Sequence, residues 1–115
     1  MTETYTELDA EALAELQDLM GEDLADLATA YAEDGQTHID TIMQALTSGD
    51  AEAASEAAHS LKSSSANMSA LGVSELARQV EMLAKAGNLA EIKPIMASLP
   101  ERFTQAVTEL QTATS

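Results

Sequence analysis

Apolar residues recur every three or four positions along almost the whole of this 115-residue chain. That spacing places them on one face of an α-helix, and no stretch alternates apolar and polar residues with the period of two expected of a strand. Alanine supplies 22 residues and aromatic side chains only three. Small side chains allow helices to pack closely against helices, so the pattern predicts an all-α protein.

Capping residues, glycines and prolines divide the chain into helices. We expect helices to start at an N-cap Asp9, at about Glu22 and at Ala51, and again after breaks at 68–70 and 87–88. Pro94 and Pro100 must kink the last segment or delay its start, because proline lacks the N–H that a helix interior needs. Short loops make neighbouring helices antiparallel. The expected fold is one domain over 1–115, with an ordered core at about 8–111. It is an antiparallel up-down four-helix bundle with a short additional N-terminal helix.

The large apolar residues predict which faces of the helices are buried. On the first helix they are Leu13, Leu16 and Met20. On the long second helix they are Leu24, Leu27, Tyr31, Ile39, Ile42 and Leu46. The third helix turns Ala54, Ala57 or Ala58, Leu61, Ser65 and Met68 inward, so it is expected to be the most central.

The net charge of −15 argues against binding to nucleic acid or to an anionic membrane surface. Residues 1–61 hold fifteen acids and no lysine or arginine, whereas residues 62–115 hold five of each sign. No apolar run reaches the ~20 residues of a membrane span, and residues 1–20 lack the pattern of a signal peptide. We therefore expect a cytoplasmic protein without a nucleic-acid or membrane partner.

Most catalytic and metal-binding patterns are missing from the sequence. Cysteine is absent, and there is no glycine-rich phosphate loop, GxSxG or HExxH motif. Glu56 and His59 form one ExxH pair, but a di-iron bundle needs a second, and His38 has Gly35 at the matching position. It also needs inward carboxylates, and the predicted buried faces contain none. We expect no metal and no cofactor of the chain's own.

His59 is the residue whose position suggests chemistry. It lies about 200° round the third helix from Leu61, so its imidazole is expected to point outward. Lys62 and Ser63 follow one turn later on the same face. An exposed imidazole beside an ammonium group can act as a nucleophile on an anionic phosphoryl group. Spacing alone leaves open an exposed histidine without a function.

Residues 59–70, HSLKSSSANMSA, resemble the signature of histidine-containing phosphotransfer (HPt) domains. That signature reads His-x-Leu-Lys-Gly, two small residues, a three-residue gap and Gly-Ala, followed by a Leu/Val-rich helix that Val73, Leu76, Val80 and Glu81 fit. Tyr31 and Asp34 resemble the family's aromatic-x-x-Asp pattern, and Gly49-Asp50 its turn before the histidine helix. The resemblance covers about Asp9 to Gly87.

The resemblance implies a phosphorelay intermediate in two-component signal transduction. His59 would accept a phosphoryl group from a receiver-domain aspartate, through Nε2, and pass it to another receiver, while Lys62 contacts the phosphoryl group. Such a chain is a monomeric phosphoryl carrier without an ATP site, and not an enzyme in its own right. Its partners are response-regulator receiver domains, a hybrid sensor kinase, or both, and the receiver brings the Mg²⁺. The expected docking surface around His59 includes Ser55, Glu56, Ser63 and Ala66.

Two serines depart from the family pattern. Ser63 and Ser69 stand where the family has glycines, on the docking face and at the turn after the third helix. The Ser63 hydroxyl can bond back to the His59 carbonyl or reach a phosphoryl oxygen. A left-handed conformation at Ser69 would cost about 1 kcal/mol. These departures keep an alternative open: a degenerate, acidic binding module that docks or sequesters a partner without phosphoryl transfer.

The sequence does not decide which residue orients the imidazole. Gln36, Arg78 and Gln79 are candidates for holding the ring or for lining the docking surface, and Glu56 could accept a hydrogen bond from it.

Overall fold

The computed structural model describes residues 7, 8 and 10–114, and none of them forms a strand. The elements are α1 (Ala10–Met20), α2 (Asp23–Ser48), α3 (Ala51–Asn67), α4 (Leu71–Lys85), a short 3₁₀ helix η1 (Leu89–Glu91), α5 (Ile92–Met96) and α6 (Leu99–Ala113). The expected N-cap Asp9 lies outside the described residues.

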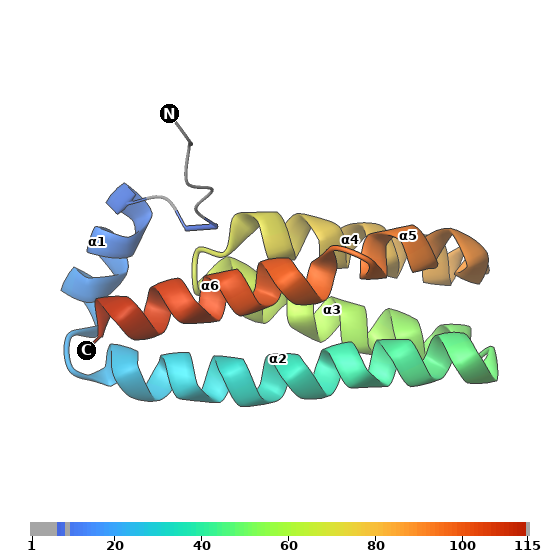
Figure 1. Cartoon of the computed structure of the whole chain (residues 1–115), viewed down its shortest axis with the longest axis horizontal. Coiled ribbons are helices and arrows are strands. Elements are labelled where there is room, and N and C mark those ends of the chain that lie inside the picture. The colour runs from blue at the N-terminus through green and yellow to red at the C-terminus, as the bar shows by residue number, and fades with distance from the viewer. Residues whose placement is uncertain (1–6, 9, 115) are drawn as a thin grey trace.

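Helices α2, α3, α4 and α6 run lengthwise beside one another, and α1 lies across one end of them (Figure 1). Helix α3 packs against both α2 and α4, and α6 closes the bundle against α2 and α4. The expected helical bundle with an additional N-terminal helix is therefore confirmed. The last segment is interrupted as its prolines predict, since α5 ends at Met96 and α6 restarts with Pro100 in its first turn.

Local chemistry sets both ends of α3. Gly49 is left-handed, with φ of 79°, and it closes α2 as its amide donates to the Ala45 carbonyl. The Asp50 carboxylate then accepts from the Ala53 amide at 3.1 Å and caps α3. At the other end Ser69 has a φ of 61°, so the left-handed conformation that glycine favours falls on a serine.

The buried face of α2 combines large and small residues. Leu24, Tyr31, Ile39 and Ile42 are buried as predicted, and the small residues Ala28, Gly35 and Ala45 are buried on the same face. Leu27 is 38 % exposed, and Met20 at the end of α1 is 36 % exposed, so both predictions of burial were wrong. Ala28, and not its neighbour Leu27, lies on the buried face, and the small residues there let neighbouring helices approach closely.

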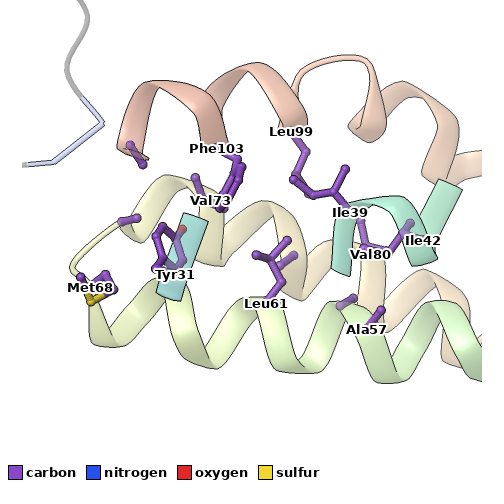
Figure 2. Packing of buried hydrophobic residues seen from close by; sticks show 14 of the residues in the cluster. Tyr31, Ile39, Ile42, Ala57, Leu61, Met68, Val73, Val80, Leu99 and Phe103 are labelled. Atoms are coloured by element: carbon purple, nitrogen blue, oxygen red, sulfur yellow. The ribbon is translucent and has the colours of Figure 1, made fainter. Parts of the chain in front are cut away.

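An aromatic pair locks α6 onto this buried face. The ring of Phe103 meets Tyr31 edge-on, with 5.2 Å between centroids, and a Cβ on Gly35 would collide with the Phe103 ring. The Tyr31 hydroxyl forms a 2.7 Å hydrogen bond with Ser65 of α3. Figure 2 shows Tyr31 and Phe103 in the core with Leu61 and Val80. These contacts fix α3, which carries His59, within the bundle.

Candidate functional site

His59 lies near the middle of α3 and points away from the core. Its side chain is 62 % exposed, whereas Leu61 is fully buried on the opposite side of the helix. The His59 imidazole therefore points outward, as the helical geometry predicts. A reactive ring nitrogen at this place can be reached by another protein.

Glu81 of α4 holds the imidazole in place. Its Oε2 lies 2.8 Å from His59 Nδ1, and its Oε1 accepts a 2.7 Å hydrogen bond from Lys62 Nζ. Lys85 Nζ lies 3.3 Å from the same Oε2. The Glu81 side chain is only 7 % exposed, so a buried carboxylate joins an imidazole and two ammonium groups.

The packing of α4 on α3 brings Glu81 to this position. Glu81 shares the buried face of α4 with Ala77 and Ala84, four residues before it and three after it. The small alanines let α4 lie close to α3, and the Ser74 hydroxyl donates to the Lys62 carbonyl at 2.9 Å. These contacts hold α4 against α3, the helix that carries His59.

Glu81 stays ionised over the physiological range. The hydrogen bond from Lys62 is the largest of the effects that lower the pKa of its carboxyl, to about 2, with His59 and Lys85 adding to it and burial opposing it. An ionised carboxylate only accepts hydrogen bonds, so the proton of a neutral His59 ring must sit on Nδ1. The lone pair then sits on Nε2, which has no hydrogen bond within the described part of the chain.

A hollow of about 450 Å³ opens beside the ring. It is lined by Ser55, Glu56, His59, Ser60, Glu81 and Lys85. Ser55 and Glu56, both predicted for the docking surface, therefore lie next to His59. Ser63 and Ala66 do not line the hollow, but both are exposed further along α3.

None of the candidates named from the sequence orients the imidazole. Gln36 donates to Asp40, while Arg78 and Gln79 both donate to Glu75 on the exposed side of α4. Glu56 is an exposed neighbour of the ring.

The expectation that no carboxylate faces inward was also wrong, because Glu81 is buried. Its three- and four-residue spacing from Ala84 and Ala77 was the signal that could have found it, since those alanines mark the inward face of α4. Lys85, one turn further on, was missed with it.

The site offers a histidine but no metal-binding cluster. Among residues 7, 8 and 10–114, no three His, Cys, Asp or Glu side chains come together to hold an ion. Within the same residues, no helix has the length and apolar character needed to cross a membrane. His38, the other histidine, is half-buried on α2 and outside the hollow.

Comparison with known proteins places this arrangement in a family. The Hpt domain family matches residues 26–113, which include His59 and all of its partners. The crystal structure of histidine-containing phosphotransfer protein B (HptB) from Pseudomonas aeruginosa PAO1 superposes with a TM-score of 0.87, at 26 % sequence identity and over 95 % of each chain. No curated protein matches the chain. The chain belongs to the Hpt domain family.

Proposed function

We propose that this protein is a phosphorelay intermediate that carries a phosphoryl group on His59 between receiver domains. The observation that carries the proposal is the exposed imidazole whose Nδ1 is held by the buried Glu81 carboxylate, which leaves the Nε2 lone pair facing outward. Membership of the Hpt family and similarity to HptB support it. We expect the protein to act as a cytoplasmic monomer with receiver domains, a hybrid sensor kinase, or both as partners.

The chemical step is a transfer from oxygen to nitrogen. Nε2 of His59 attacks the phosphorus of an aspartyl phosphate, the N–P bond forms, and the P–O bond breaks to release the receiver's carboxylate. The ring gains positive charge as the N–P bond forms, and the Glu81 carboxylate stabilises that charge through the Nδ1–H. In the reverse direction the electron pair of the N–P bond returns to Nε2 and the next aspartate takes the phosphoryl group.

Lys62 is placed to serve both Glu81 and the phosphoryl group. Its side chain is 30 % exposed and its ammonium group already neutralises Glu81 from the α3 side. We propose that it also contacts the phosphoryl oxygens during transfer, where negative charge must be balanced. The protein then acts as a phosphoryl carrier, with Mg²⁺ supplied on the receiver.

The docking surface is proposed to surround the hollow. Ser55 and Glu56 line it beside His59, and Ser63 and Ala66 extend the exposed face of α3. Ser63 has no side-chain hydrogen bond among the described residues, so its hydroxyl is free for a partner's group or a phosphoryl oxygen.

Phosphotransfer from a panel of phosphorylated receiver domains tests the proposal. We expect rapid labelling of the wild type and of His38→Gln, the matched histidine control, and none of His59→Gln. The label should be acid-labile and stable in alkali, as expected of an N–P bond. Label that persists on a folded His59→Gln variant would contradict the assignment.

The same experiment separates the alternative of an acidic binding module. A module without phosphoryl chemistry would bind a receiver but take no label from it. Its affinity would be the same for His59→Gln and would fall strongly with salt, because exposed charges are screened within about 8–10 Å.

A further inference from the structure

Lys85 is the second ammonium group at the site, and it is held differently from Lys62. Lys85 Nζ lies 3.3 Å from Glu81 Oε2, the oxygen that His59 Nδ1 already occupies at 2.8 Å. Lys62 has Oε1 to itself at 2.7 Å. The Lys85 side chain is 66 % exposed and that of Lys62 is 30 % exposed. Lys85 therefore has the longer and more solvated ion pair, which costs less to break.

Lys85 also lies at the hollow beside the His59 ring. Lys85 lines it together with His59 and Ser60, whereas Lys62 does not. Lys85 comes from the last turn of α4 and Lys62 from α3, so the two cations reach Glu81 from different helices, which pack against each other (Figure 1).

Charge at the site favours a role for both lysines once a phosphoryl group is present. With a neutral His59, the Glu81 carboxylate is balanced by one ammonium group and the second is in excess. A phosphoryl group on a ring nitrogen adds nearly two negative charges in the same small space. An excess cation at the edge of the hollow is then the group best placed to pair with them.

We infer that Lys85 is a second phosphoryl-binding residue, which exchanges its ion pair with Glu81 for one with the phosphoryl oxygens on His59. The inference rests on the proposed function. Lys62 keeps Glu81 in place, so the hydrogen bond from Nδ1 to Glu81 persists while Lys85 moves. The exchange breaks and forms only ion pairs. Its effect is to hold the phosphorylated form, because the phosphoryl group must break its ion pair with Lys85 before it can leave the site as inorganic phosphate.

Chemical phosphorylation with phosphoramidate tests this without a receiver. Nε2 attacks phosphorus, the P–N bond of phosphoramidate breaks, and ammonia leaves with a proton from water. The variants are Lys85→Gln, Lys85→Arg and, as a matched control, Lys93→Gln. Lys93 lies on α5 and lines a different hollow with Met43 and Leu46 of α2. The rate of phosphate loss is followed by phosphorus NMR.

We expect Lys85→Gln to lose phosphate about 3- to 10-fold faster than wild type, and 1 M salt to remove most of the difference. Lys85→Arg and Lys93→Gln should keep the wild-type rate. Equal rates for Lys85→Gln and Lys93→Gln would overturn the inference.

The unphosphorylated variants give the second readout. Lys85→Gln should leave the Nδ1–H of His59 hydrogen-bonded to Glu81, and loss of that hydrogen bond would also overturn the inference, because Lys85 would then act by positioning Glu81. Failure of the proposed function is distinguishable, since the wild type would then take no label from any phosphorylated receiver, although phosphoramidate would still phosphorylate the exposed His59.

Discussion

Replacing Glu81 with glutamine tests the buried carboxylate at the centre of the site. Glu81 accepts from His59 and Lys62 at 2.8 and 2.7 Å while only 7 % exposed. The Glu81→Gln substitution removes the negative charge and one of the two acceptor oxygens, so at least one of these hydrogen bonds is lost and the contact with Lys85 is weakened. The loss should amount to about 2–3 kcal/mol of unfolding free energy at pH 7, because the ammonium group of Lys62, only 30 % exposed, loses the carboxylate that balances its charge.

The pH dependence of this loss follows from the sign of the shift. The pKa of Glu81 falls from its ordinary 4.5 to about 2 in the fold, with Lys62 the largest cause. Its stabilisation is therefore complete above about pH 5 and is lost as the pH falls toward 2. At pH 3 the unfolded chain has bound the proton and the folded chain has not, which removes about 2 kcal/mol from the wild type alone. The difference between wild type and Glu81→Gln should shrink to below about 1 kcal/mol.

Urea unfolding followed by circular dichroism at pH 7, 5, 4 and 3 measures this difference. Glu75→Gln is the matched control on the same helix. The pKa of Glu75 is also lowered to about 2, chiefly by its hydrogen bond from Arg78, but this pair is exposed. Salt should weaken the Glu75 effect and leave most of the Glu81 effect. A Glu81→Gln variant as stable as wild type at pH 7, or a difference independent of pH, would refute the reasoning.

Three further substitutions test the fold and the site. Ser69→Gly replaces a serine in the left-handed conformation, so it should raise the unfolding free energy by about 1 kcal/mol and Tm by several degrees. An unchanged Tm would show that the turn is unstrained. Gly35→Ala should lower the unfolding free energy by about 1–2 kcal/mol, because its Cβ would collide with Phe103. An unchanged or higher urea concentration at the unfolding midpoint would contradict that packing. Lys62→Ala should slow phosphoryl transfer at saturating receiver more than it raises Kd, and equal losses would count against a contact made in the transition state.

The sequence predicted the features that depend on local chemistry. Periodicity and breakers predicted a helix over 51–67 and the interruption at the prolines, because capping and φ restrictions act within a few residues. The outward direction of His59 followed from the angle between it and Leu61 on one helix. A resemblance over 59–70 predicted the family, which the match over 26–113 confirms.

Features that depend on packing between helices were missed. Ala28, Gly35 and Ala45 lie on the buried face of α2. Close packing requires small residues there, as at Gly35 against Phe103, but a search for large apolar residues passes over them. Glu81 lies 22 residues from His59 and 19 from Lys62 in the chain. Burying a glutamate costs free energy unless its charge is paired, and its partners are brought to it only by the packing of α3 against α4.

The most direct test is to identify the ring nitrogen that carries phosphorus after loading from a cognate receiver. In protein labelled with ¹⁵N at histidine, coupling to ³¹P distinguishes the two nitrogens of His59 and both from His38. We predict phosphorus on Nε2 of His59, with the Nδ1 proton still hydrogen-bonded to Glu81. Phosphorus on Nδ1, on His38 or on a carboxylate would contradict the account.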